Sequence, residues 1–232
     1  MPKARYTVYW LGRDGGNWYP GPITPTPAGS HRKHSKNLRR RVRTEAIRQA
    51  QRGLRLRLWF EEEARFGRMT DPRRAWAPPG VRPLVPRRME REYGYAYAAV
   101  APHEGALVSL VLPEVNAELM SLFLAEVARR YPQDFILMVL DGAGWHKAGE
   151  LIVPAQMRLE WLPARSPELN PVEHVWEELR EKWLGNRLFE EQAAVDRQVA
   201  AGLASLEKDP KRVASFAGFP WIQRMLLNPK HS

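Results

Sequence analysis

The stretch FILMVLDG, residues 135–142, decides the fold of this chain. Its first six residues, Phe135 to Leu140, form a short apolar run of the kind found in a β-strand that is buried on both faces. Such a strand needs helices on both sides of its sheet, so the run predicts an α/β domain. Asp141 ends the run, and Gly142 follows it. Asp141 is therefore either a turn residue or a carboxylate presented at the end of a buried strand, where ligands bind in sheets of this kind.

A second strand is predicted from alternation. Residues 54–60 read LRLRLWF, and their apolar and polar side chains alternate with a period of two. Continued in the same parity, Glu62 lies on the apolar side, whereas Glu61 and Glu63 lie on the opposite side. The three acids are either a solvated charge run or the place where one carboxylate, that of Glu62, enters a site.

The stretch SPELNPVEHVWEELR, residues 166–180, predicts a helix start. Asn170 is expected to cap the helix, with Pro171 at the first position. An apolar stripe at helical spacing follows, formed by Val172, Trp176, Leu179 and Trp183. Glu173 has three open interpretations: the third residue of a capping box, a charge that favours the positive end of the helix dipole, or a third site carboxylate.

The rest of the sequence predicts the other strands of the sheet and the helices that flank it. Strands are expected at Tyr93–Val100, Ala106–Leu112 and Met157–Leu162, helices at Asn116–Arg130, Glu190–Leu206 and Arg212–Leu226, and mostly loop at Ala75–Arg88. Three early antiparallel strands followed by strand–helix crossovers predict a mixed sheet flanked by helices, an α/β architecture of the ribonuclease H-like type. The predicted domains are an arm over 1–52, the catalytic unit over 53–187 and a helical extension over 188–232.

Composition limits the class of protein. The 232 residues include no cysteine, which excludes disulfides and thiolate metal sites and fits a reducing cytoplasm. No apolar run approaches the roughly 20 residues that a membrane span requires, and the N-terminus lacks the apolar core of a signal peptide. We therefore expect a cytoplasmic protein without a membrane partner.

The net charge of +10 lies in the N-terminal arm. Residues 1–52 hold 12 Lys or Arg against 2 Asp or Glu, and the other 180 residues hold 24 of each. Residues 11–31 lack a periodic apolar pattern, so a poorly structured basic arm is expected, with a possible helix at 36–52. Arg39, Arg40, Arg41 and Arg43 are candidate contacts to DNA phosphates, and the alternative is a solvated tail.

Four strings together resemble one family. WFEEEARFGR (59–68), RAWAPPGVRP (74–83), MVLDGAGWHKAGEL (138–151) and LPARSPELNPVEHVWEELREKW (162–183) are similar to the catalytic domain of DDE transposases. The resemblance is to the bacterial insertion-sequence branch of the mariner superfamily and covers roughly residues 54–185. Few other families place S-P-x-L-N-P-x-E after a strand, so the last string is specific.

The resemblance implies an activity and a site. Members of the family cut and rejoin double-stranded DNA at element ends and target, using two Mg²⁺ (or Mn²⁺) ions held by three acids. Carried onto this sequence, the first acid is Glu62, the second is Asp141 and the third is Glu173. Two such ions about 3.5–4 Å apart help the nucleophile attack and relieve charge on the leaving oxygen. Because the family cuts and joins two DNA ends, the resemblance also implies at least a dimer.

The histidines His146 and His174 lack a partner at metal-ligand spacing, and Trp145 and Trp176 are expected in the core.

The sequence departs from the family in two places. Position 62 holds Glu where the family has Asp, a side chain longer by one methylene, and a displacement of about 1 Å can cost on the order of 100-fold in rate. Relatives also carry helix-turn-helix domains before the catalytic core, and no such pair of helices is recognisable in residues 1–53. Two alternatives to an active transposase therefore remain: an inactive relative that keeps weak non-specific DNA binding, and a stand-alone nuclease.

Overall fold

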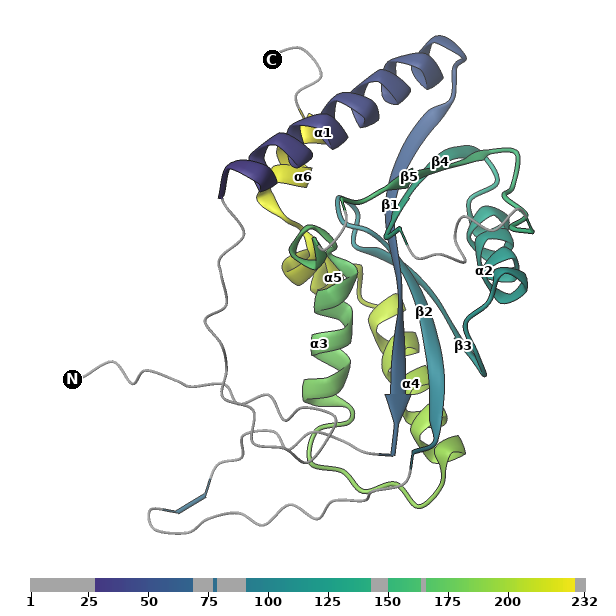
Figure 1. Cartoon of the computed structure of the whole chain (residues 1–232), viewed down its shortest axis with the longest axis vertical. Coiled ribbons are helices and arrows are strands. Elements are labelled where there is room, and N and C mark those ends of the chain that lie inside the picture. Colours follow the sequence, from purple (N-terminus) through teal and green to yellow (C-terminus); the bar gives the residue numbers. More distant parts are fainter. Residues whose placement is uncertain (1–27, 69–76, 79–90, 143–149, 164–165, 228–232) are drawn as a thin grey trace, which may run out of the picture.

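A five-stranded mixed sheet organises the chain (Figure 1). The computed structural model describes residues 28–68, 77–78, 91–142, 150–163 and 166–227. The strands are β1 (Arg55–Gly67), β2 (Tyr93–Ala101), β3 (Ala106–Leu112), β4 (Asp134–Leu140) and β5 (Met157–Trp161), in the spatial order β3-β2-β1-β4-β5. The helices are α1 (Ala28–Gln51), α2 (Ala117–Arg130), the short 3-10 helix η2 (Pro167–Leu169), α3 (Val172–Lys182), α4 (Gln192–Glu207), α5 (Pro210–Ala217) and α6 (Pro220–Leu227).

The central position of β1 follows from its two pairings. β1 runs antiparallel to β2 and parallel to β4, and β4 continues parallel to β5. The predicted ribonuclease H-like mixed sheet is confirmed. β1 is longer than its alternating stretch suggested, because its pairing with β2 continues to Gly67, opposite Tyr93. The predicted loop at Ala75–Arg88 falls almost wholly outside the described residues.

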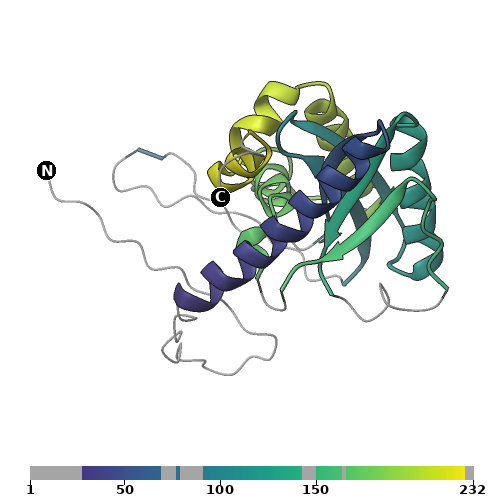
Figure 2. The ribbon, with the colours of Figure 1, turned by 90° about the horizontal axis from the view of Figure 1, so that it is seen from above.

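Helices lie on both faces of the sheet (Figure 2), and an apolar core lies on each face. On one face, Phe123 and Val127 of α2 belong to the same apolar cluster as Trp59 of β1. On the other face, residues of α3, α4 and α5 share a cluster with Phe60. Burial on both faces explains why β4 is a continuous apolar run, since neither face of that strand meets water.

The C-terminal helices belong to the main core. Val195, Val199 and Leu203 of α4 lie in the same apolar cluster as Trp176 of α3 and Phe60 of β1. The one helix predicted at Arg212–Leu226 is two in the structure, α5 and α6, with the break at Gly218 and Phe219. The division predicted at residue 188 therefore does not separate two cores.

A second difference concerns the basic arm. Residues 28–51 form the single helix α1, which crosses one end of the sheet close to α6 (Figure 1). Leu38 and Val42 are each 1 % exposed. Their spacing of four residues places both on one side of the helix, and that side joins the core of α3 and α4. The possible helix expected at 36–52 is thus present within α1, and for residues 28–51 a docked helix takes the place of the expected loose arm.

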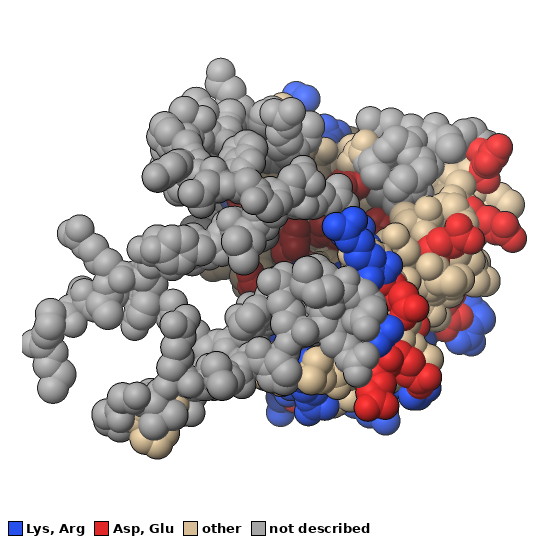
Figure 3. Space-filling view, turned by 60° about the horizontal axis from the view of Figure 1, so that its bottom comes forward, with Lys and Arg blue, Asp and Glu red and all other residues tan. Residues whose placement is uncertain are grey.

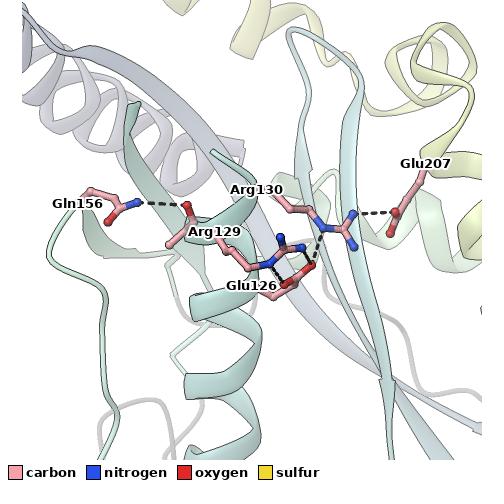
Figure 4. Close-up of polar contacts among 6 residues, drawn as sticks. Glu126, Arg129, Arg130, Gln156 and Glu207 are labelled. Carbon is pink, nitrogen blue, oxygen red and sulfur yellow. Dashed lines mark hydrogen bonds and ion pairs between the residues drawn. The ribbon is translucent and has the colours of Figure 1, made fainter. Parts of the chain in front are cut away.

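An ion-pair cluster ties together helices from opposite faces of the sheet (Figure 4). Near the end of α2, Glu126 accepts hydrogen bonds from Arg129 and Arg130. Arg130 also donates to Glu207 at the end of α4, with 2.8 Å between Nη1 and Oε2. The two arginines hold the pKa of Glu126 at about 2. The cluster lies near the surface, where solvent screens the charges, so it contributes little to stability.

Candidate active site

Glu62 occupies the middle of β1, on the face covered by α3. The alternation of the strand places it with Phe60 and Ala64, which belong to the core of α3 and α4. Its carboxyl group is half-buried. The sequence prediction that Glu62 shares the side of the apolar residues is confirmed.

Asp141 follows β4 directly and lies beside the same point of β1. The parallel register pairs Phe60 with Val139, so two residues further along both strands Glu62 is level with Asp141. Asp141 is exposed to solvent. It follows a strand whose residues from Phe135 to Leu140 are buried, so it lies at the edge of the core.

Glu173 reaches the site from the first turn of α3. The backbone enters this helix through η2, Asn170 and Pro171, and Pro171 takes the place of the N-cap without a side-chain hydrogen bond. The carboxyl group of Glu173 forms a hydrogen bond with that of Glu62. In a capping box the N–H of Asn170 would donate to the side chain of Glu173, but this N–H donates to the carbonyl oxygen of Pro167 at 2.8 Å, so the capping-box alternative for Glu173 is wrong.

Asn170 makes a third polar contact at this point. Its Nδ2 donates to Oε2 of Glu62 at 2.9 Å and to the carbonyl oxygen of Glu61 at 3.0 Å. Its Oδ1 accepts from the amide of Val172 at 3.1 Å. The expected capping role of Asn170 is therefore only part of what its side chain does. The bond to Glu62 was missed because it joins residues 108 positions apart.

The electrostatics of the cluster follow from its crowding. The pKa of Glu62 is raised to about 8, mainly by burial and then by the charge of Glu173, the hydrogen bond with Glu173 and the charge of Asp141. Two carboxyl groups in contact must share a proton when nothing else neutralises them. The three acids thus form one electrostatic unit, which is the condition under which a cation would be attracted.

The donor set suits a hard divalent cation. Carboxylate oxygens are the ligands that Mg²⁺ prefers, and Mn²⁺ accepts the same ligands. Among the described residues, no group of three or more His, Asp or Glu side chains is already arranged to hold a metal ion. In this arrangement Glu62 and Glu173 contact each other, and a cation would replace the shared proton.

Glu61 is buried, although one interpretation of the sequence placed it in a solvated run of three acids. It is 0 % exposed and lies on the α2 face of β1, opposite to Glu62. Burial, followed by the charges of Glu63, Glu62 and Asp141, raises the pKa of Glu61 well above its usual value. The charge-run interpretation is wrong for Glu61 because β1 is central and both of its faces are covered.

The histidines and tryptophans near the predicted site have different surroundings. Trp176 is 1 % exposed and packs edge-on against Phe66, so its prediction as a core residue is confirmed. The ring of His174 packs against Phe219 and its Nδ1 lies 3.0 Å from a carboxylate oxygen of Glu177, which is packing at the surface. Trp145 and His146 lie outside the described residues.

The four arginines proposed for DNA have different surroundings on α1. Arg40 is exposed. Arg41 is engaged at the end of β5, with its Nε 2.8 Å from Glu160 and its Nη2 3.2 Å from the carbonyl oxygen of Trp161. The guanidinium of Arg39 lies over the ring of Trp221, 5.8 Å from its centroid. Arg43 is half-buried. Of these four, Arg40 and Arg41 are exposed, and Arg41 is engaged by Glu160.

The surface of the molecule shows acidic and basic groups close together. In the space-filling view, Asp and Glu side chains lie next to Lys or Arg side chains on the face that is turned forward (Figure 3). In the described part of the chain, no helix is both long and apolar enough to cross a membrane.

Comparison with known proteins gives three findings. Residues 57–196 match the family described as DDE superfamily endonuclease. An uncharacterized protein of Sinorhizobium fredii (strain NBRC 101917 / NGR234), y4pE/y4sA, is 38% identical over 133 residues, which are 57% of this chain and 98% of that protein. The fold resembles the Mos1 mariner paired-end complex with Mn, with a TM-score of 0.53 and 15% identity over 95% of this chain and 68% of that one. A Mos1 transposase paired-end complex with the left transposon end gives 0.50 and 18% identity, over 88% and 67%.

Proposed function

Because this chain belongs to the DDE superfamily endonucleases, the family that its residues 57–196 match, we propose that it is the catalytic domain of a transposase. It cuts and joins strands of double-stranded DNA by phosphoryl transfer during movement of an insertion sequence. The observation that carries the proposal is the electrostatic unit of Glu62, Asp141 and Glu173, which come from β1, the end of β4 and the start of α3. All three lie within the matched residues.

The proposed roles follow from the position of each side chain. Glu62, Asp141 and Glu173 would hold Mg²⁺ or Mn²⁺, because their oxygens are the donors that these ions prefer. Bound there, the ions supply charge that favours the attacking and leaving oxygens of a phosphodiester. The protein contributes the placement: β1 and β4 are fixed by their parallel pairing, and Glu173 is fixed by the start of α3.

The DNA partner is proposed from charge. Arg40 on the exposed side of α1 is a candidate contact to a phosphate, with Arg39, Arg41 and Arg43 as neighbours on the same helix. Phosphate contacts of this kind position a duplex without reading its sequence. Joining at two element ends further implies that two copies act together as a homodimer on DNA.

Metal-dependent nicking of supercoiled plasmid tests the activity. The native chain should convert plasmid to the open circle with Mn²⁺ or Mg²⁺, and Asp141→Ala should abolish this. Glu177→Ala is the matched control, because Glu177 is an exposed carboxylate on α3 whose contact is His174. Equal background nicking by the native chain and by Asp141→Ala would show that the chain is an inactive relative of the transposases. Cutting without joining, in an assay that offers a target duplex, would identify a nuclease.

A further inference from the structure

We infer that Asn170 is a positioning residue that holds the Glu62 carboxylate toward Glu173 and so sets the affinity of the site for a divalent cation. The inference rests on the proposed function, since it concerns the same three acids. Asn170 does not join them as a ligand. It acts on the cation through Glu62, by a hydrogen bond from Nδ2 to Oε2.

The orientation of the Asn170 amide is fixed by its neighbours. Its Oδ1 accepts from a backbone N–H, that of Val172, and its Nδ2 donates to a backbone carbonyl, that of Glu61. A backbone N–H can only donate and a carbonyl can only accept, so the amide cannot be reversed without losing both bonds. The second hydrogen of Nδ2 must then point at Glu62.

Burial makes this contact persistent. Asn170 is 2 % exposed, so water does not compete effectively for its hydrogen bonds. The same side chain joins the backbone of β1 to the start of α3, where Glu173 lies one residue beyond Val172. One amide therefore sets the separation between the element that carries Glu62 and the element that carries Glu173.

The length of Glu62 makes such a restraint necessary. Glu has one more rotatable bond than the Asp that the family places here, and each free bond spreads the carboxylate over more positions. With Oε2 held by Asn170, the carboxyl group that is hydrogen-bonded to Glu173 has less freedom to move. Outer hydrogen-bond partners that orient a ligand commonly change metal affinity by about 10- to 100-fold when they are removed.

The test measures Mn²⁺ affinity by the electron paramagnetic resonance signal of free Mn²⁺, together with the melting temperature. Asn170→Ser is the decisive variant, because a serine oxygen can still accept from the amide of Val172, whereas its hydroxyl is one bond shorter than the Asn170 amide and falls short of Glu62. Asn116→Ser is the matched control: Asn116 caps α2 by accepting from Leu119 at 2.8 Å, far along the chain from the acids.

We expect Asn170→Ser to bind Mn²⁺ about 10- to 100-fold more weakly than the native chain, with Asn116→Ser unchanged. The increase in melting temperature produced by Mn²⁺ should shrink in parallel for Asn170→Ser alone. Equal Mn²⁺ affinity of the native chain and Asn170→Ser would refute the inference and leave the proposed function standing. A folded native chain without Mn²⁺ binding would refute both.

A double-mutant cycle separates positioning from general loosening of the turn. In Glu62→Asp the carboxylate is one methylene shorter and loses its reach to Asn170. The loss of Mn²⁺ affinity caused by Asn170→Ser should therefore be several-fold smaller in the Glu62→Asp background than in the native one. The same loss in both backgrounds would mean that Asn170 acts on the turn and not on Glu62, which overturns the inference.

Discussion

Glu61 and Glu62 are adjacent acids with opposite environments. The strand turns Glu62 toward α3 and Glu173, and it turns Glu61 into the core beneath α2. A period of two decides this, since neighbouring side chains of a strand point to opposite faces. The pair offers a comparison in which the same chemical change is made on each face.

Replacing each acid by its amide isolates the role of Glu62. Glu62→Gln should lower Mn²⁺-dependent nicking by at least about 100-fold, more than the loss of an outer partner of a ligand usually costs. Glu61→Gln should stay within about threefold of the native rate, because Glu61 lies buried on the opposite face of β1 and burial favours its uncharged form, which the amide resembles. Initial nicking rates at saturating Mn²⁺ measure both, and similar losses in the two variants would contradict the assignment of Glu62.

The raised pKa of Glu62 predicts a pH effect on stability without metal. The folded chain keeps this proton up to about pH 8, whereas the unfolded chain loses it near the ordinary value of 4.5. The folded state thus binds more protons between these values, and the free energy of unfolding should fall as the pH rises through this window. The free energy of unfolding can be measured by urea unfolding at pH 5 to 8, with a chelator present to remove metal ions.

Glu62→Gln provides the control for the pH effect. Its amide does not ionise, so the part of the decline that comes from Glu62 should vanish, while other groups contribute as before. The native chain and Glu62→Gln should therefore differ most in slope between pH 5 and 8. Parallel profiles would show that Glu62 ionises in the folded chain much as it does in the unfolded one.

At the scale of elements, α1 and α3 both depend on partners far away in the chain. α1 lies across β5 and α6: Arg41 pairs with Glu160, and Glu45 accepts from Arg158 at 3.0 Å. α3 is joined to β1 by Asn170. Each helix is thus placed by a few contacts that its own sequence does not contain.

The docking of α1 can be tested by a small cavity. Val42→Ala should lower the free energy of unfolding by about 1–3 kcal/mol, because Val42 is 1 % exposed and packs in the main core. Thr44→Ala, at an exposed position of the same helix, should change it by less than about 0.5 kcal/mol. Denaturant unfolding measures both, and an unchanged stability for Val42→Ala would favour the solvated tail that the sequence also allowed.

At the scale of the whole molecule, the charge is divided between two regions. The net charge of +10 comes from residues 1–52. The site, in contrast, holds three acids: Glu62 contacts Glu173, and the charge of Asp141 acts on Glu62. A duplex approaching the acids is repelled unless cations are present, and α1 supplies positive charge in the same molecule. We therefore expect metal ions and α1 to contribute separately to DNA affinity.

Salt dependence distinguishes the arginines of α1. Arg40→Ala should reduce the slope of log affinity against log salt by about 0.9, the value for one lost phosphate contact on duplex DNA. Arg41→Ala should change this slope less, since Arg41 is already paired with Glu160. Fluorescence anisotropy with a labelled duplex at 50 to 200 mM salt measures the slopes. Equal slopes for the native chain and Arg40→Ala would exclude Arg40 as a phosphate contact.

Local sequence patterns alone predicted the strands, most of the helices and the positions of the three acids. Alternation in β1, the apolar run of β4 and the helical stripe of α3 are local periodicities, and a local period survives in any tertiary context. The same patterns placed Glu62, Asp141 and Glu173 at the ends or faces where a site could form. The family resemblance then agreed with these positions.

Only the tertiary structure decided how the acids interact and what surrounds them. The burial of Glu61, the docking of α1 and the bond from Asn170 to Glu62 each depend on groups that lie far away in the chain. Burial and hydrogen bonding are properties of the assembled core, and a residue's own neighbours in sequence do not contain them. A local sequence pattern determines on which face of a strand or helix a side chain lies, whereas the packing of the whole fold determines which groups lie against that face.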